Sequence, residues 1–391
     1  MQMAVEASID AEWLLKDYLI RGRYNRIMPY PRHVAIAGGG VIGLACALVF
    51  RRRGLQVTVL EAGEAMKEAS WAAGGMLAVE DPENSSALLP LSRYSRSLYE
   101  AFLQEIEALS GKRVPLRTHQ TVQVVEAVRA GAPGIPLSHD EARRLVPALR
   151  EADHRYLLLE EASLDPRDLC AALPLAARAA GVVLREHEWV LSVEADGDAV
   201  LLSSDTGTVR ADAFVNCCGA WTGTLDPSAG VAPCKGQMLV IAQPEGPQLT
   251  RVLRSAEVYL IPRGDDRIVI GATVEDAGYS KQVEPAALAI LRKRAAALWP
   301  PAMDAPYVES WAGLRPGSAD GLPVIGASRP RQDSQFLATG HHRNGILLAP
   351  GTAHAIADLV CGTAPSVDLA PFRPHRTSMP AACDNHFAAA L

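Results

Sequence analysis

The segment at 38–61 restricts the fold more than any other part of the chain. It reads GGGVIGLACALVFRRRGLQVTVLE, with spaced glycines at its start and a single acidic residue at its end. One apolar run, HVAIAG, leads into it at 33–38, and a second, QVTVLE, closes it at 56–61. Apolar residues recur at helical spacing between the two runs. The pattern therefore predicts a strand, a tight turn, a helix and a second strand.

The three glycines have distinct roles in a turn that binds a dinucleotide. Gly38 permits the tight turn, Gly40 lets the backbone approach a pyrophosphate, and Gly43 lets the helix pack closely on the strand. The phosphates would lie at the helix N-terminus, where backbone amides are free. Glu61 stands where a carboxylate accepts hydrogen bonds from ribose hydroxyls and repels a 2′-phosphate, which disfavours NADP. FAD and NAD both fit this motif.

Two later stretches bear on the choice between FAD and NAD. ASWAAGGML, at 69–77, has few bulky groups, so that a flat cofactor has room against its backbone, although a flexible loop has the same composition. WAGLRPGSADGLPVIG, at 311–326, carries Arg315 among apolar and turn residues. A guanidinium there is either a buried structural ion or a group that binds a substrate carboxylate with two hydrogen bonds.

A third stretch, ATGHHRNGILLAPGTAHAIADLV at 338–360, predicts a strand, a glycine turn and a helix near 350–361. Backbone amides at Gly345 and Ile346 would face a flavin ring, where the positive end of a helix dipole favours the anionic reduced flavin. The adjacent histidines His341 and His342 are not expected to bind a metal, because such a pair rarely forms a site alone.

With these motifs in place, the chain resembles the FAD-dependent amine oxidases of the D-amino acid oxidase superfamily, and among them the glycine oxidase branch of thiamine biosynthesis. The resemblance covers about residues 33–365. Its most specific pieces are ASWAAGGML, YLIPR at 259–263, GLRPGSADGLPVIG and GHHRNGILLAP.

The resemblance implies an α/β fold in which a doubly wound FAD-binding domain is interleaved with an antiparallel β-sheet substrate domain. The expected boundaries are an N-terminal extension at 1–32, an FAD-binding domain at 33–80, 140–230 and 315–370, a substrate domain at 81–139 and 231–314, and a tail at 371–391. Elsewhere, apolar spacing predicts a short helix within 1–32 and a second at 166–180, capped by Asp165 with Pro166 in its first position.

The resemblance also implies the residues of the site. Arg315 would hold the substrate carboxylate, Tyr259 would donate a hydrogen bond to it, and Arg343 would complete the carboxylate end of the site. The cofactor is expected to be FAD, bound by the fingerprint, by the small-residue stretch and by the turn before the last helix. The implied contacts are Gly38, Gly40, Val41, Ile42, Gly43, Glu61, Ala62, Ser70, Gly74, Gly75, Met76, Val190, His341, His342, Arg343, Asn344, Gly345, Ile346 and Leu347.

Two positions depart from the glycine oxidase pattern. Val274 stands where that pattern has Met, and Gly74 where it usually has Ala. Both changes remove bulk near the expected site, so that slightly larger amines would fit. No Cys occurs between 235 and 360, where covalent members attach the flavin, so FAD is expected to bind non-covalently.

The implied reaction oxidises glycine or another small amino acid. Arg315 and Tyr259 would fix the carboxylate and point Cα–H at flavin N5. Hydride would pass from Cα to N5, the imine would hydrolyse to a 2-oxo acid and ammonia, and the reduced flavin would give hydrogen peroxide with oxygen. A dehydrogenase of D-amino acids or sarcosine that passes electrons to another carrier, and a non-catalytic flavin-binding module, stay open as alternatives.

The charge and cysteine content of the chain limit the kinds of partner and compartment that we expect. The net charge of −6 disfavours nucleic acid and anionic membranes as partners. The seven cysteines include no CxxC pair, which predicts reduced thiols and a cytoplasmic location. The expected partners are a small amino acid and oxygen, and self-association is left open.

Overall fold

The structure is a computed structural model that describes residues 31–128, 133–151, 154–329 and 334–376. All of these except Pro31 belong to one compact unit that begins at Arg32. The helix expected within residues 1–32 lies outside the described residues. Among the described helices, none has the length and apolarity needed to cross a membrane.

The fingerprint folds as the sequence predicts. Strand β1 (His33–Ala37) leads through the glycine turn into helix α2 (Val41–Arg52), and β2 (Gln56–Leu60) returns parallel to β1. Together they form the centre of a six-stranded sheet. From edge to edge its strands are β19 (Val324–Ala327), β20 (Gln335–Thr339), β13 (Ala213–Asn216), β1, β2 and β9 (Val183–Arg185), all parallel except β19.

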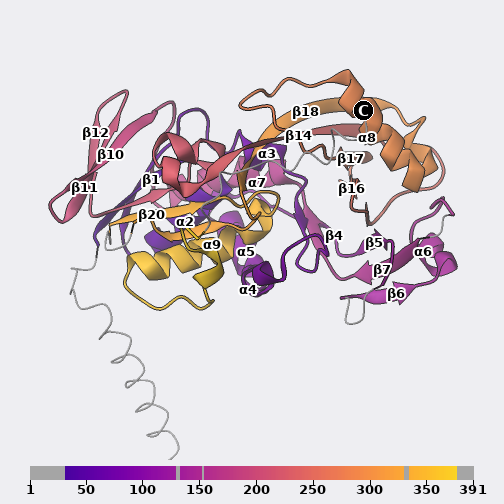
Figure 1. The fold of residues 1–391 in the computed structure, drawn as a ribbon, viewed down its shortest axis with the longest axis horizontal. Coiled ribbons are helices and arrows are strands. Elements are labelled where there is room, and N and C mark those ends of the chain that lie inside the picture. The colour runs from indigo at the N-terminus through magenta and orange to yellow at the C-terminus, as the bar shows by residue number, and fades with distance from the viewer. Residues whose placement is uncertain (1–30, 129–132, 152–153, 330–333, 377–391) are drawn as a thin grey trace, which may run out of the picture. The chain divides into compact units, whose positions relative to one another are not determined.

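The two faces of this sheet are covered differently, as the alternation of β1 shows. Val34 and Ile36 pack into a core built with the helices, whereas Ala35 and Ala37 face a small three-stranded sheet. Figure 1 shows this small sheet and α9 on opposite sides of β1 and β20. The helices are α2, α4 (Leu89–Ser97), α5 (Tyr99–Ser110), α7 (Pro166–Ala179) and α9 (Gly345–Val360), and the small sheet is β10 (Val190–Asp196), β11 (Ala199–Ser204) and β12 (Thr208–Ala211).

A second, eight-stranded sheet forms the other half of the unit. Its long strands β14 (Val231–Ala242) and β18 (Tyr307–Ser318) pair antiparallel along most of their lengths, and α8 (Pro285–Leu298) covers one face. In order, its strands are β18, β14, β17 (Arg267–Gly271), β16 (Tyr259–Pro262), β15 (Val252–Arg254), β5 (Thr121–Val125), β7 (Arg155–Leu159) and β6 (Ile135–Leu137). The α/β class of the fold is thus confirmed.

The expected domain boundaries differ from the fold in several places. α4 and α5, expected in the substrate domain, pack in the core of the six-stranded sheet, and β18, which the boundary at 315 divides, belongs wholly to the eight-stranded sheet. β7, within the stretch 140–230 that was assigned to the FAD-binding domain, pairs with β5 in the eight-stranded sheet. Short strands then link the two parts, since β8 (Ala162–Leu164) pairs with both β3 (Met76–Leu77) and β4 (Leu116–Thr118). A boundary near residue 160 would follow the strand order more closely.

The last helix starts earlier than the sequence predicts. α9 begins at Gly345 rather than near residue 350, so Pro350 lies inside it. An internal proline normally leaves the carbonyl four residues earlier without its hydrogen bond. Here that carbonyl belongs to Ile346, and the Tyr99 hydroxyl donates to it. A side chain remote in sequence therefore replaces the hydrogen bond that Pro350 removes.

Helix α7 and its cap match the prediction. Asp165 Oδ1 accepts a hydrogen bond from the Arg167 backbone N–H at 2.9 Å, and Pro166 occupies the first turn. We expect Asp165→Ala to lower the free energy of unfolding by about 1 kcal/mol, because the cap is lost. Asp165→Asn retains a capping oxygen and should stay near wild type in urea unfolding. Equal destabilisation by both variants would show that the ion pairs of Asp165 with Arg263 and Arg267 matter more than the cap.

The expectation of reduced thiols is wrong at one position. Cys46, Cys170, Cys217, Cys218 and Cys361 carry free thiols, whereas Cys234 is disulfide-bonded. The prediction relied on the absence of a CxxC pair, and spacing along the chain does not report which cysteines meet in space.

Candidate active site

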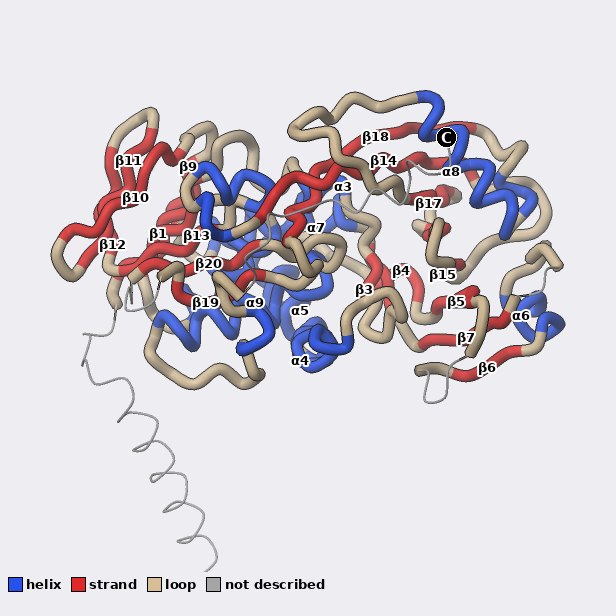
Figure 2. Tube along the Cα trace, in the orientation of Figure 1, coloured by secondary structure: helices blue, strands red, loops and turns tan. Residues whose placement is uncertain are grey.

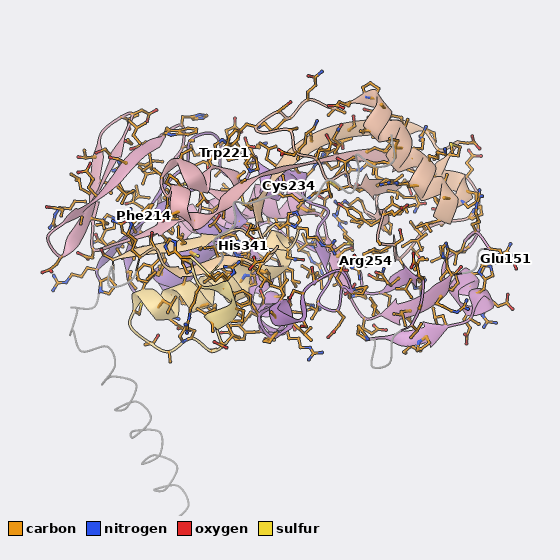
Figure 3. The ribbon with its side chains drawn as sticks, in the orientation of Figure 1. Glu151, Phe214, Trp221, Cys234, Arg254 and His341 are labelled. Atoms are coloured by element: carbon orange, nitrogen blue, oxygen red, sulfur yellow. The ribbon has the colours of Figure 1, made fainter. Side chains whose placement is uncertain are left out.

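One large cavity of about 1020 Å³ is lined by residues from both sheets. On the six-stranded side it begins just beyond the carboxyl ends of β1, β2 and β13, at Gly38, Glu61 and Cys217. This is the edge of a parallel sheet where nucleotides bind in α/β folds. Figure 2 shows the loops that join this edge to β14 and β18. In Figure 3, Trp221 and His341 lie on the side of the six-stranded sheet and Arg254 on the side of the other.

The glycine turn fits a bound pyrophosphate. A Cβ on Gly38, whose φ is +103°, would lie 2.3 Å from the Cys217 carbonyl oxygen, and one on Gly43 would lie 2.0 Å from the Gly38 oxygen. Only the Ser70 hydroxyl, at 3.3 Å, lies near a Cβ placed on Gly40, which lines the cavity. The first and third glycines are therefore required by packing, and the second leaves the backbone open to a ligand.

Glu61, which follows β2, accepts hydrogen bonds from backbone amides of the glycine turn and of the residues after it. Glu61 Oε2 accepts from the Gly39 N–H at 2.7 Å, and Oε1 accepts from the Gly63 N–H at 2.9 Å. Each carboxylate oxygen retains a further lone pair, and Glu61 lines the cavity, so ribose hydroxyls can still donate to it. At the start of α2, Ser70 Oγ accepts from the Val41 N–H at 2.9 Å, which leaves its own proton for a phosphate.

Most of the expected FAD contacts line this cavity. They comprise Gly38, Gly40, Val41, Ile42, Glu61, Ala62, Ser70, Gly74, Gly75, Met76, Val190, His341, His342, Arg343, Asn344, Gly345 and Ile346. Gly43 and Leu347 are not among the lining residues. Gly43 packs α2 against the turn, as predicted, and Leu347 is 1% exposed in the helical core.

Tyr259 and Arg315 meet at the end of the cavity bounded by the eight-stranded sheet. Arg315 Nη1 donates to the Thr273 carbonyl at 3.0 Å and to the Lys235 carbonyl at 3.4 Å. Gly236 makes room for it, since a Cβ there would lie 2.4 Å from the guanidinium. Gly271 does the same for the Tyr259 ring, with its hydroxyl oxygen 2.6 Å from the position of a Cβ. Because Gly236 and Gly271 have no side chains, the Arg315 guanidinium and the Tyr259 hydroxyl have room to face the cavity.

The protonation states of this pair suit an anionic ligand. Burial raises the pKa of Tyr259, although Arg315 and Arg343 oppose the shift, so the phenol keeps its proton and can donate. Burial lowers the pKa of Arg315, but guanidinium titrates so far above neutrality that it stays charged. A charged donor and a neutral donor lie side by side, which is the arrangement that binds a carboxylate.

Arg343, expected at the same end, is already paired. Its guanidinium donates to Asp81 Oδ2, and its side chain is 37% exposed. Asp81 is 4% exposed as a side chain and also lies 3.6 Å from Arg254 Nη1, which in turn lies near Glu161. Burial alone would raise the pKa of Asp81, but Arg254 and Arg343 outweigh it and hold that pKa below its usual value.

This ion-pair cluster was missed by the sequence-based prediction. Asp81 and Arg254 both line the cavity, and Arg254 Nε also donates to Gln123 Oε1 at 2.5 Å. The only sequence signal is an arginine that ends the apolar strand VLR, because the acids that neutralise it lie far away along the chain.

The two histidines of the GHHRNG turn are neutral. Burial lowers the pKa of His341 to about 3, and His341 Nε2 lies 3.0 Å from the Thr352 hydroxyl. Burial, Arg315 and Arg343 lower the pKa of His342 to about 3. Neutral imidazoles at this turn add no charge at the start of α9.

The buried His341 makes folding sensitive to acid. An unfolded histidine gains a proton near pH 6.5, whereas His341 in the folded state gains one only near pH 3. The unfolded state therefore binds more protons between these values, and stability falls as the pH drops through this window. Going from pH 7 to 5 should cost about 2 kcal/mol through this residue. His341→Asn should lose correspondingly less over the same range in urea unfolding, and equal losses would contradict the assignment.

The fold and the glycine cradle at the strand ends fit a flavin-dependent oxidoreductase. A family model described as FAD-dependent oxidoreductase matches residues 33–359, and the chain belongs to this family. The matched region covers both sheets and every expected site residue. FAD is accordingly the cofactor.

The relatives of this chain include glycine oxidases and bifunctional ThiO/ThiG proteins. The chain is 34% identical to a glycine oxidase of Pseudomonas aeruginosa, over 87% of this chain and 98% of that one. It is 36% identical to a bifunctional protein ThiO/ThiG of Nostoc, over 84% of this chain and 52% of that one. The crystal structure of glycine oxidase from Geobacillus kaustophilus superposes with a TM-score of 0.83 at 33% identity, covering 89% of this chain and 99% of that chain.

Proposed function

We propose that this protein is an oxidase of glycine or another small amino acid. The observation that carries the proposal is the pairing of Arg315 with Tyr259 at the cavity end opposite the nucleotide turn. The names of the relatives that match nearly its whole length support the same activity. The ThiO/ThiG relatives support a place in thiamine synthesis.

The proposed roles follow from the geometry. Arg315 binds the substrate carboxylate with two hydrogen bonds, and the Tyr259 hydroxyl donates a third. These contacts turn the Cα–H bond toward the cofactor, and this orientation is the main contribution that the chain makes. FAD, when bound, supplies the two-electron oxidation that converts the amine to an imine. The imine then hydrolyses to a 2-oxo acid and ammonia.

The size of the accepted amino acid depends on two positions. Val274 and Gly74 both line the cavity, and a Cβ on Gly74 would lie 3.4 Å from the Tyr259 ring. Both residues are smaller than those usual in the glycine oxidase pattern. We therefore propose that the site also admits amines slightly larger than glycine.

Arg343 has a secondary role in this proposal. Its guanidinium lies close enough to Arg315 and Tyr259 to shift the pKa of each, but Asp81 neutralises it. We propose that Arg343 adds positive charge near the substrate carboxylate, which Arg315 and Tyr259 bind directly.

The proposal is tested by anaerobic titration of the yellow protein with glycine, sarcosine, D-alanine and D-proline. Bleaching of the flavin by one or more of these amino acids, with glycine among the good reductants, is the expected result. Failure of all four to bleach a flavin that dithionite reduces normally would show that the site accepts a different class of substrate.

A further inference from the structure

A buried lysine lies behind the strand that lines the substrate end of the cavity. Lys235, in β14, is 1% exposed, although lysine is almost never fully buried unless it is paired. Its Nζ lies 3.1 Å from Glu275 Oε2 and 3.3 Å from Glu284 Oε1. The flanking Gly236 and Met238 line the cavity, so strand alternation places the Lys235 side chain on the opposite face. The lysine therefore does not face the substrate.

The same lysine and glutamate are joined through their backbones. Lys235 N–H donates to the Glu275 carbonyl and Glu275 N–H donates to the Lys235 carbonyl, both at 3.0 Å. Gln237, which is fully buried, donates through Nε2 to Glu275 Oε1 at 2.8 Å and through its backbone N–H to Thr273 Oγ1 at 2.7 Å. These contacts hold segment 273–275 against β14, beyond the end of β17 at Gly271.

Two carbonyl oxygens of this assembly orient Arg315. One belongs to Thr273, at 3.0 Å from Nη1, and the other to Lys235, at 3.4 Å. The Lys235 carbonyl thus accepts from both the Glu275 amide and the guanidinium. A shift of segment 273–275 would move a carbonyl that accepts from Arg315, and with it the position of the guanidinium that faces the cavity.

Hydrogen bonds from neighbouring groups favour the ionised form of the Glu275 carboxyl group. Burial alone would raise the pKa of Glu275, but hydrogen bonds with Thr273, Gln237 and Lys235 outweigh burial and hold that pKa below its usual value. The carboxylate is therefore ionised at neutral pH, where it balances the buried ammonium of Lys235.

We propose that Glu275, held by Lys235, is a positioning residue for Arg315 and thereby sets the affinity of the site for a substrate carboxylate. This inference rests on the proposed function, because it assumes that Arg315 binds that carboxylate. Glu275 acts through the Thr273 and Lys235 carbonyls and does not touch the substrate.

Glu284 supplies a matched control. It also pairs with Lys235, but its side chain is 58% exposed and it precedes α8, outside segment 273–275. Glu275→Ala should raise both KM for glycine and Kd for acetate about tenfold, with kcat within about twofold of wild type. Glu284→Ala should change each value less than about twofold. Acetate binding is read from the absorbance change of the flavin in the holoenzyme, and FAD content is measured for every variant.

The comparison separates positioning from general stability. Equal effects of Glu275→Ala and Glu284→Ala, or a loss of kcat with KM and Kd unchanged, would overturn the proposal. If Glu275→Ala does not fold, Glu275→Gln and Glu284→Gln carry the same comparison, with a smaller shift expected because the amide still accepts a hydrogen bond.

Arg315→Ala distinguishes this proposal from the proposed function. If Arg315→Ala binds acetate as tightly as wild type, the carboxylate site itself is wrong, and the positioning role fails with it. If Arg315→Ala loses acetate binding while Glu275→Ala retains it, the positioning role alone is overturned.

Discussion

Replacing Arg315 by alanine is expected to raise KM for glycine more than about a hundredfold. A charge-assisted bidentate contact contributes up to about 3 kcal/mol, and each 1.4 kcal/mol corresponds to a tenfold change in affinity. The guanidinium is held by two carbonyls in a space that Gly236 leaves open. Steady-state kinetics and FAD content of the purified variant check the prediction.

Arg210→Ala is the matched control for this variant. Arg210 pairs with Asp196 on the small three-stranded sheet, and its side chain is 62% exposed. Its removal should leave KM within about twofold of wild type. An Arg315→Ala protein that retains FAD and shows an unchanged KM would refute the assignment of the carboxylate site.

Gly43→Ala is expected to abolish FAD binding and to destabilise the fold by about 3 kcal/mol. The added Cβ would lie 2.0 Å from the Gly38 carbonyl oxygen, which is far inside van der Waals contact. The obstacle is backbone, so no side chain can rotate away and α2 must move relative to the glycine turn. Overpacking of this kind costs about 1–3 kcal/mol even where the surroundings relax, and here the shift also opens the pyrophosphate cradle.

Gly207→Ala controls for the general effect of adding a methyl group. No heavy atom lies within 4 Å of a Cβ at Gly207, and its φ is not in the left-handed region. Unfolding in urea and flavin content should both stay at wild-type values. A Gly43→Ala protein that is yellow and unfolds at the wild-type midpoint would contradict the role of this glycine.

The parts of the site that follow from local rules could be predicted from the sequence. The tight turn at 38–43 depends on steric limits within a few residues, so the glycine spacing with its flanking strand and helix predicted its conformation. Arg315 stood out as a lone cation in an apolar stretch, but the residues around it left a structural ion and a carboxylate ligand both open, and only the family resemblance implied the second role. Local rules also predicted the cap of α7 by Asp165.

The parts that depend on contacts between remote segments could not be predicted. α9 begins at Gly345 rather than near residue 350, and the Tyr99 hydroxyl, from a helix remote in sequence, replaces the hydrogen bond that Pro350 removes. Asp81 gave no signal and Arg254 only that of an arginine at the end of an apolar strand, because the two residues meet only in the fold. Lys235 likewise looks like a surface lysine in the sequence, and only the fold shows that two acids surround it.

The central claim, that the chain oxidises a small amino acid with oxygen as the acceptor, is tested most directly by product stoichiometry in air. The purified holoenzyme is mixed with glycine, and hydrogen peroxide, ammonia and the 2-oxo acid are measured in the same reaction. The account predicts one peroxide and one ammonia for each 2-oxo acid formed. A 2-oxo acid that appears without peroxide, and only when an artificial electron carrier is added, would contradict it and identify the protein as a dehydrogenase.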